Sequence, residues 1–553
     1  MAIPQKTESQ IAMDRQNALA ARYRRVRLLI VEDSAEARGM LRGFMRDSGV
    51  EKIDLASSGQ EAIEAMKSHR YDVVLCDYNL GKGKDGQQVL EEARVSKYLS
   101  YNTVFMMITA ETTLEMVMGA LEYQPDNYLS KPFTKNDLTR RLDRALSVKL
   151  EYRAIEAAFE AEDYEKTLTL CLEKLQDTSA SHFRAQRLRG ESLLGLNRYD
   201  EAAALYRDIL AQREVSWAKI GLGRTLYRQK VLDEAAEIFN GLIADQPNVV
   251  ESYDWLARIQ IAQGEPRVAQ DTLEVATLRS PKAILRQVEL ARVAMQNRSF
   301  LVAEKAYRKA IVLAVDSCYH SPDHYLQYIR ALLVKIDGTG SKFETDAFKE
   351  AQVFLGRLRK EFPDQPVIDF KVTMMEALVN HLHLQFGTAE RLAKRGISLF
   401  NGFTIGPQIT LAEEYISALS QMGLFEQAES FVHDMQKTTN KPDLANRLHK
   451  RIQEGKLRVQ SEALNTAALE LHQRGKILEA HAKFREAAAA GGVSQNLLIN
   501  AARVCLELAE REDLNREDWR AECETYLNRL TDLDSRDHRY ETYDDLRTRF
   551  SVL

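Results

Sequence analysis

The fold of the first part of the chain is decided by residues 71–80, which read YDVVLCDYNL. A mostly apolar run from Val73 to Cys76 leads directly into one acid, Asp77, and a loop rich in Gly and Lys comes after it. A short continuous apolar run predicts a strand that is buried on both faces, as in a parallel sheet. Open α/β sheets bind their ligands beyond the carboxyl ends of the strands, which is where Asp77 would lie.

Three further segments of the same kind, at 27–31, 104–108 and 127–130, are also predicted strands. The polar residues at the ends of the four strands are Glu32, Asp33, Asp77, Thr109 and Lys131. If the strands run parallel, these side chains converge on one edge of the sheet. Three carboxylates in one pocket repel one another unless a divalent cation joins them. Mg²⁺ suits a site with few oxygen ligands, because it keeps several waters and accepts a phosphate oxygen.

A lysine and a hydroxyl that face the metal would contact a phosphoryl group carried by Asp77. The predicted chemistry is therefore nucleophilic carboxylate catalysis, which gives an aspartyl phosphate. On these strand ends and their spacing, residues 25–147 resemble a response-regulator receiver domain. The resemblance implies a doubly wound, flavodoxin-like fold with strand order 2-1-3-4-5 and alternating helices.

The resemblance also implies a role for each acid. Asp77 matches the phosphoacceptor, Asp33 a direct Mg²⁺ ligand, and Glu32 the second acidic position. The backbone carbonyl of Asn79 matches a further ligand of the metal. One departure is the loop 81–86, which is longer than usual and lacks the common proline. A degenerate receiver, which keeps the pocket but is not phosphorylated, is the alternative.

Other positions carry over to the phosphoryl contacts and to the switch. Thr109 and Lys131 match the residues that contact the phosphoryl group, and Tyr128 matches the aromatic side chain that rotates with Thr109 in the switch. Asn79 and Glu111 match the two positions that modulate attack by water, and hence the lifetime of the phosphorylated form. The last receiver helix, from 135, continues past 147 without Pro or Gly, so it can transmit a change of orientation from the Tyr128 face to the helices beyond it.

Beyond about residue 147, internal repetition replaces the strand pattern. Ala202, Ala235, Ala269 and Ala303 recur at intervals of 33, 34 and 34 residues. A small residue lies twelve positions before each alanine, and a large apolar one lies four positions after it. The small residues are Gly190, Gly223, Ala257 and Ala291, and the large ones are Tyr206, Phe239, Leu273 and Tyr307. The pattern resembles tetratricopeptide (TPR) repeats, helical hairpins that bury their apolar faces only by stacking.

The expected organisation is therefore a multidomain chain, with an α/β receiver followed by an all-α TPR-type solenoid. Its parts are a polar leader (1–24), the receiver (25–147), TPR repeats (148–320) and divergent helical repeats with a C-terminal cap (321–553). A divergent unit is expected around 152–175, and the pattern returns at Ala428 and Ala480. A separate all-helical domain over 321–553 is the alternative.

The composition narrows the functional classes. The net charge of −5 on 553 residues gives no global field that favours nucleic acid, and no apolar run approaches the roughly 20 residues of a membrane helix. The five cysteines are far apart and form neither a zinc-ligand pattern nor a disulfide framework, which indicates a reducing cytoplasm. Each cysteine is expected to be a small core residue, and residues 518–520, around Trp519, are expected on a solvated helix face.

The function expected from these features is that of a bacterial two-component adaptor. A sensor histidine kinase or phosphotransfer protein would phosphorylate Asp77, and the repeats would hold or release an unknown protein ligand in the TPR groove. No enzyme activity is expected beyond the receiver's own phosphoryl transfer and dephosphorylation. One alternative is a regulator whose helical repeats read RNA or act on transcription, although neither a basic stripe nor a helix-turn-helix segment is visible. An enzyme of unrecognised type in 321–553 is a third possibility.

Overall fold

A computed structural model describes most of the chain. The described residues are 23–110, 125–176, 182–336, 341–491, 493–511, 515–531, 533 and 539–553. The chain divides into two compact units, which we call the first unit (residues up to 293 together with 309–320) and the second unit (294–308 together with 321–553). Almost all of the expected polar leader lies outside the described residues, as does the helix expected at 114–123.

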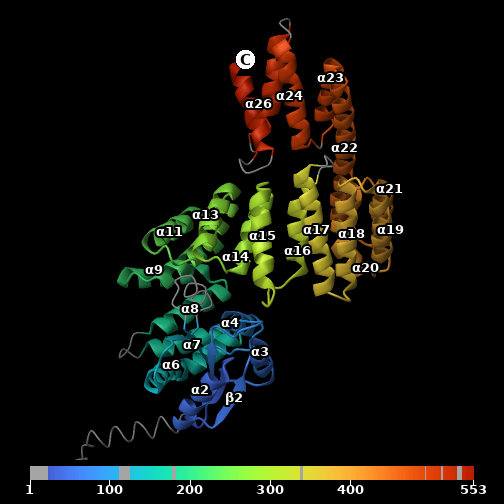
Figure 1. Cartoon of the computed structure of the whole chain (residues 1–553). Helices are drawn as coiled ribbons and strands as arrows, with labels where there is room; N and C mark the ends of the chain where they lie inside the picture. The colour runs from blue at the N-terminus through green and yellow to red at the C-terminus, as the bar shows by residue number, and fades with distance from the viewer. Residues whose placement is uncertain are drawn as a thin grey trace, which may run out of the picture. The chain divides into compact units, whose positions relative to one another are not determined.

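The first unit begins with a five-stranded parallel sheet, drawn in blue in Figure 1. Its strands are β1 (Arg27–Val31), β2 (Lys52–Ala56), β3 (Val73–Asp77), β4 (Val104–Thr109) and β5 (Asn127–Ser130). Their order is β2-β1-β3-β4-β5, and every adjacent pair is parallel. All residues of β3 and β4 are buried, as expected for continuous apolar strands covered on both faces. The predicted doubly wound fold is confirmed.

Helices cover both faces of this sheet. They are α2 (Ala35–Asp47), α3 (Gly59–Ser68), α4 (Gly86–Val95) and α6 (Lys135–Glu160). The buried side chains of α3 and α4 pack on one face of the sheet, and those of α2 and the first half of α6 pack on the other. Ser34 caps α2, and Met40 is 44% exposed because the buried stripe of this helix runs through Leu41 and Met45.

Helical hairpins occupy the rest of the first unit, drawn from teal to green in Figure 1. The helices are α7 (Tyr164–Leu175), α8 (Phe183–Gly195), α9 (Tyr199–Gln212), α10 (Ser216–Arg228), α11 (Leu232–Asp245), α12 (Glu251–Ala262), α13 (Pro266–Arg279), α14 (Ile284–Gln296) and α15 (Phe300–Ala314). The four repeating alanines are fully buried. Helix α6 runs without a break from the receiver into the first hairpin, as the sequence around 147 predicts.

The small and large positions of the repeat meet within two of the hairpins, α8–α9 and α10–α11. A Cβ atom placed on Gly190 would lie 2.3 Å from the hydroxyl of Tyr206, and one on Gly223 would lie 2.5 Å from the ring of Phe239. The ring of Tyr206 also lies against Gly221, in the helix that comes next. Glycine at 190 and 223 therefore admits the aromatic ring that ties the two helices together.

The same kind of turn joins the two helices of many hairpins in both units. Each such turn contains one residue in the left-handed conformation, just before the second helix of the hairpin begins. In eight of these turns the residue with positive φ is Glu162, Asn197, Lys230, Gly264, Arg298, Leu384, Gly423 or Gly475, and a helix begins two residues after each of them. A left-handed residue stops the first helix, and the next residues re-enter the helical conformation. The same hairpin is therefore repeated as far as Ile477, which supports the prediction of a continued solenoid.

The second unit is all helical in its described parts. Besides the first part of α15 it contains α16 (Pro322–Leu333), α17 (Lys342–Glu361), α18 (Pro366–Leu382), α19 (Phe386–Asn401), α20 (Ile405–Gln421), α21 (Phe425–Thr438), α22 (Pro442–Gln473), α23 (Ile477–Ala489), α24 (Gln495–Arg511), α25 (Arg516–Asn528) and α26 (Tyr540–Val552). Among the described residues, no helix has the combination of length and apolar character that crossing a membrane requires. The domain limits drawn from the sequence remain a prediction.

Candidate functional site

An acidic pocket lies at the carboxyl edge of the sheet, where the sequence predicts it. Glu32 and Asp33 come directly after β1, and Asp77 is the last residue of β3, the central strand. One carboxylate oxygen from each of the three lies within 4.8 Å of those of the other two. Glu32 and Asp77 are only 1% and 7% exposed, whereas Asp33 is exposed at the mouth of the pocket. The pocket therefore combines two buried acids with one that solvent reaches.

Lys131 joins the two buried acids. Its Nζ donates to Asp77 Oδ2 over 2.9 Å and to Glu32 Oε2 over 3.0 Å. Burial lowers the pKa of Lys131, but its hydrogen bonds to Asp77 and Glu32 outweigh that effect and hold the pKa above its ordinary value. Burial, together with the neighbouring charge of Asp77, raises the pKa of Glu32. One ammonium group thus faces several carboxylates, and a further cation would complete the charge balance.

The loop after Asp77 is shaped by two glycines. Gly81 has φ +73°, and its N–H donates to Asn79 Oδ1 over 3.3 Å. A Cβ atom on Gly86 would lie 2.2 Å from the carbonyl oxygen of Asp77, so only glycine lets α4 begin against the backbone at the end of β3. Asp85 caps α4 reciprocally with Gln88. The long loop foreseen from the sequence is therefore anchored at both ends.

The predicted switch residues lie on the neighbouring strands β4 and β5. Thr109 is 7% exposed and pairs with Ser130 in the β4–β5 register, and its carbonyl accepts a hydrogen bond from the N–H of Lys131 over 2.7 Å. The hydroxyl of Tyr128 is buried and has no hydrogen-bond partner among the described residues, and burial raises its pKa to about 12. Glu111, the second residue predicted to affect the phosphoryl lifetime, lies outside the described residues.

The receiver contacts the repeats beside the loop that follows Asp77, within the first unit. The sequence did not predict this contact. Lys84 Nζ donates to the carbonyl of Asp316 over 2.5 Å, and Ser317 Oγ donates to Glu91 Oε2 over 3.0 Å. Lys282, at the end of another hairpin, lies over the ring of Tyr78 at 5.9 Å. The segment that starts at the residue after Asp77 therefore contacts the repeats directly.

The second half of α6 makes another contact with the receiver. Lys149, 8% exposed, pairs with Asp126 over 2.8 Å, and Ser100 Oγ donates to Glu160 Oε2 over 2.6 Å. The rings of Tyr101 and Phe159 meet edge to face at 5.5 Å. Because α6 is one helix, these contacts fix its repeat half against the receiver loop near residue 100.

The geometry defines a receiver-type domain joined to a helical solenoid, and comparison with known proteins agrees. The model of the response regulator receiver domain matches residues 28–143, and the tetratricopeptide repeat model matches residues 152–216 and 187–249. The chemotaxis protein CheY-3 of Vibrio cholerae is 31% identical over 119 residues, which is 22% of this chain and 90% of that protein. The chain therefore belongs to the response regulator family, with tetratricopeptide repeats after its receiver domain.

Further relatives match the same part of the chain. The chemotaxis protein CheY of Pseudomonas aeruginosa is 27% identical over 119 residues, 94% of its length. A crystallised CheY4 of Vibrio cholerae is 28% identical and covers 22% of this chain and 98% of its own, with a TM-score of 0.21. These relatives cover the receiver alone.

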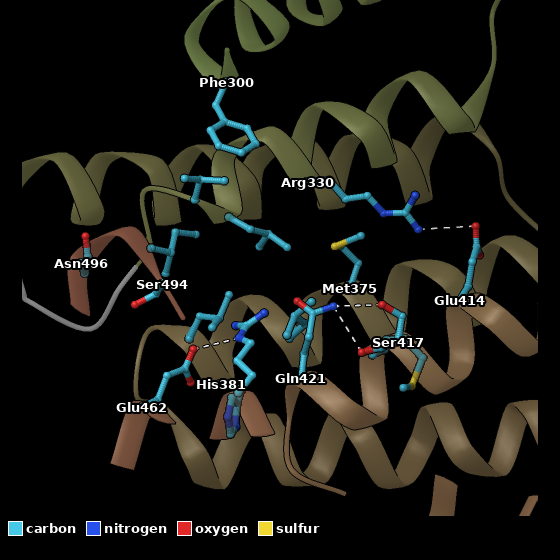
Figure 2. A pocket seen from close by; sticks show the side chains of 18 of the residues that line it. Phe300, Arg330, Met375, His381, Glu414, Ser417, Gln421, Glu462, Ser494 and Asn496 are labelled. Atoms are coloured by element: carbon cyan, nitrogen blue, oxygen red, sulfur yellow. Dashed lines mark hydrogen bonds and ion pairs between the residues drawn. The ribbon is translucent and has the colours of Figure 1, made fainter. Parts of the chain in front are cut away.

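A large cavity lies in the second unit, and Figure 2 shows part of its lining. Its volume is about 1050 Å³, and helices α16, α18, α20 and α22 contribute most of its wall. Apolar side chains such as Phe300 and Met375 alternate with charged ones. The cationic lining residues are Arg298, Arg330, Lys371, Arg451, Arg458 and Arg539, and the acidic ones are Glu413, Glu414 and Glu462. Positive charge therefore exceeds negative charge in this cavity.

Proposed function

We propose that this protein is a two-component response regulator that accepts a phosphoryl group on Asp77 and uses its repeats as a phosphorylation-controlled protein-binding adaptor. The phosphoryl donor is a sensor histidine kinase or a phosphotransfer protein. The observation that carries the proposal is the meeting of Asp77, Glu32 and Asp33 with the ammonium group of Lys131 at one sheet edge.

In the proposed step, a carboxylate oxygen of Asp77 attacks the phosphorus of a phosphohistidine. The new O–P bond forms as the P–N bond breaks, and the bond electrons leave with the imidazole, which takes up a proton. Lys131 would neutralise the phosphoryl oxygens, and the hydroxyl of Thr109 would donate a hydrogen bond to one of them. Because Lys131 already lies 2.9 Å from Asp77, the charge is in place before the phosphoryl group arrives.

The pocket also fits a magnesium ion. Glu32, Asp33, Asp77 and the backbone carbonyl of Asn79 would hold it, since hard oxygen ligands with free coordination positions are what Mg²⁺ prefers. When bound, Mg²⁺ would offset the negative charge of the carboxylates and of the incoming phosphoryl oxygens. The two buried acids favour such a cation, because one lysine alone leaves them with excess negative charge.

We infer that phosphorylation reaches the repeats through the loop from Tyr78 to Asp85. This loop starts beside the modified residue and ends at the contact of Lys84 and Glu91 with residues 316–317. The predicted route through Thr109, Tyr128 and α6 is compatible with it, because Lys149 fixes α6 to the receiver. Phosphorylation of Asp77 would then change how firmly the receiver holds residues 313–317. In this way a local change of charge acts on a segment that is packed against the receiver.

The partner we propose is a protein segment with acidic and apolar side chains, held in the cavity of the second unit. Arg298 and Arg451 line this cavity, and neither has a carboxylate partner among the described residues. Glu413, Glu414 and Glu462 interrupt the cationic lining, and apolar side chains lie between the charges, so the cavity offers no continuous basic surface for a phosphate backbone and a protein partner is favoured over RNA or DNA. A gel shift with total RNA and DNA at near-physiological salt separates the two.

The experiment that tests the proposed function uses the full chain. Acetyl phosphate is added with and without Mg²⁺, and the intact mass is measured for the wild type, Asp77→Asn and the surface control Asp47→Asn. We expect a gain of one phosphoryl group in the wild type and the control, only with Mg²⁺, and no gain in Asp77→Asn. Equal labelling of Asp77→Asn would refute the role of Asp77. Affinity capture from the native cell with the wild type and Asp77→Asn then identifies the partner.

A further inference from the structure

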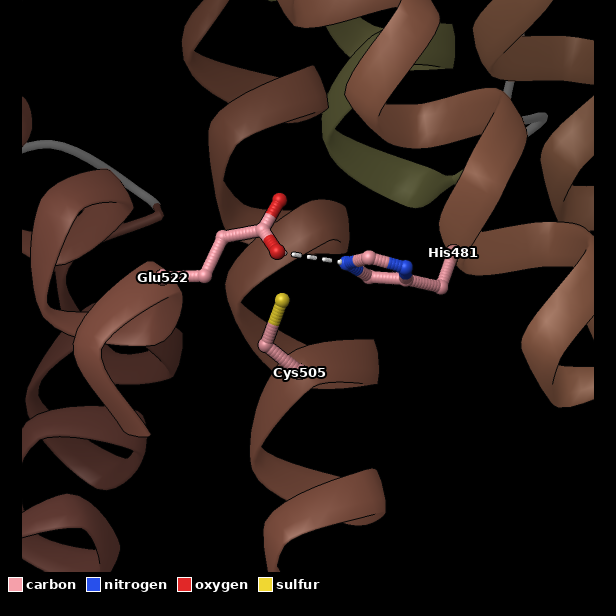
Figure 3. Close-up of side chains that lie close together, drawn as sticks. All are labelled: His481, Cys505 and Glu522. Atoms are coloured by element: carbon pink, nitrogen blue, oxygen red, sulfur yellow. Dashed lines mark hydrogen bonds and ion pairs between the residues drawn. The ribbon is translucent and has the colours of Figure 1, made fainter. Parts of the chain in front are cut away.

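Three successive helices near the C-terminus place a histidine, a cysteine and a glutamate together. His481 lies on α23, Cys505 on α24 and Glu522 on α25. One nitrogen, sulfur or oxygen atom from each lies within 4.8 Å of those of the other two, as Figure 3 shows. His481 is 4% and Cys505 0% exposed, and the Glu522 side chain retains 22% of its exposure. All three belong to the second unit.

The three side chains converge on one point. His481 Nε2 lies 3.0 Å from Glu522 Oε2, and the sulfur of Cys505 points toward the gap between that nitrogen and the carboxylate in Figure 3. In a thiol–imidazole–acid catalytic triad, the imidazole uses one nitrogen for the thiol and the other for the acid. Here both partners lie at the same ring nitrogen, which is the arrangement of ligands around a shared cation.

The donor set matches the chemistry of zinc. Imidazole nitrogen, thiolate sulfur and carboxylate oxygen are the three ligand types that Zn²⁺ takes in proteins, in tetrahedral geometry. Thiolate and carboxylate together carry two negative charges, so a divalent ion makes the buried site neutral overall. Without a cation, burial raises the pKa of the Cys505 thiol, and a bound metal would deprotonate it.

Surrounding side chains fix two of the three ligands. The hydroxyl of Tyr526 donates to Glu522 Oε1 over 2.8 Å, which leaves Oε2 to face the histidine. The ring of Trp519 meets the His481 ring edge-on at 4.7 Å. Trp519 was expected on a solvated face, but it packs against the core of these helices and its Nε1 is buried. Such supporting contacts orient metal ligands and raise affinity.

We propose that His481, Cys505 and Glu522 bind one Zn²⁺ ion, which cross-links helices α23, α24 and α25 and leaves a fourth position for water. The site is separate in sequence from the receiver pocket and differs from it in chemistry, because a soft thiolate selects zinc over magnesium. The ion would stabilise these three helices as a group, in a solenoid where each hairpin packs only against its neighbours.

A neighbouring pair of residues provides a matched control. His472 Nε2 and Glu507 Oε2 lie 2.7 Å apart in the same unit, between α22 and α24, and no cysteine joins them in the described residues. His472→Gln removes a histidine–glutamate contact of the same kind without touching the proposed site. Cys523→Ala removes a buried thiol of the same core, next in sequence to Glu522.

The test uses the full chain, stripped with a chelator and titrated with Co²⁺ in the presence of excess Mg²⁺. Cobalt takes the place of zinc, and a thiolate ligand gives it a near-ultraviolet charge-transfer absorption that the receiver carboxylates cannot produce. We expect this absorption at one Co²⁺ per chain, bleached by added Zn²⁺, in the wild type, His472→Gln and Cys523→Ala. It should be absent in Cys505→Ala, and His481→Gln should weaken metal affinity at least about tenfold.

A wild-type chain without the thiolate band would overturn the proposal, and so would a band that persists in Cys505→Ala. Circular dichroism shows whether each variant is folded. If Cys505→Ala does not fold, the Co²⁺ affinity of His481→Gln decides the question. An affinity equal to that of His472→Gln would contradict the proposed metal site. A dependence of the melting temperature on zinc in the wild type, absent in His481→Gln, is the second expected readout.

Discussion

The hydroxyl of Ser317 donates a buried hydrogen bond of 3.0 Å to the carboxylate of Glu91, across 226 residues of sequence. Glu91 lies on α4, the helix that begins against the backbone of Asp77, and Ser317 lies just beyond α15. Ser317 and Glu91 are 5% and 2% exposed. The helix next to Asp77 is therefore held against the repeats by a contact that excludes water.

Ser317→Ala should loosen this contact. It removes a hydrogen bond to a buried carboxylate, which costs about 1.5–3 kcal/mol where the acceptor is charged. We expect lower stability of the first unit in denaturant and faster hydrogen exchange in α4. Ser68→Ala removes an exposed hydroxyl with a hydrogen bond of 3.0 Å and should stay within about 0.5 kcal/mol of the wild type. Equal behaviour of the two variants would show that the contact contributes nothing.

Lys131→Ala should slow phosphoryl uptake on Asp77. The variant removes the ammonium that is placed to neutralise the transferring group, and loss of one such donor slows a reaction on the order of 10²-fold. Lys135→Ala is the control, because that lysine contacts Asp47 at an exposed position, 3.5 Å away. The rate at which the intact mass rises with acetyl phosphate and Mg²⁺ measures phosphoryl uptake in both variants. An unchanged rate in Lys131→Ala would remove this lysine from the step.

Gly223→Ala and Gly241→Ala should act in opposite directions on the repeats. A Cβ atom at 223 would lie 2.5 Å from the ring of Phe239, so overpacking should cost about 1–3 kcal/mol. Nothing lies within 4 Å of a Cβ atom at 241, inside α11, where alanine should stabilise the helix by about 0.5–1 kcal/mol. Denaturant unfolding compares the variants, and the same sign of change in both would contradict the hairpin packing described here.

The parts that could be predicted from the sequence are those that local pattern controls. Asp77 lies at the end of a buried strand because the apolar run before it has the length of a strand, and parallel strands bring such ends together. Gly190 and Tyr206 meet because the same small and large positions recur in every repeat. The hairpin at Phe386 was missed, although Leu384 makes the same turn as Gly423, because leucine gives no signal of a left-handed residue.

Contacts between distant segments could not be predicted in the same way. Nothing near Ser317 indicates that it faces Glu91, since the two residues lie 226 positions apart and no local pattern pairs them. His481, Cys505 and Glu522 lie on three helices at separations that form no known motif. Cys318 was expected in the core and is only partly buried, because it lies in the turn after α15 rather than inside a helix.

The central claim is that phosphorylation of Asp77 changes the repeats through the loop and helix α4. Hydrogen exchange at residues 309–320, measured in the full chain with Mg²⁺ before and after acetyl phosphate, tests it most directly. We predict a change of protection there and in α4 in the wild type, and none in Asp77→Asn. If intact mass shows that the wild type is phosphorylated while exchange at 309–320 and in α4 stays the same, the proposed coupling is wrong.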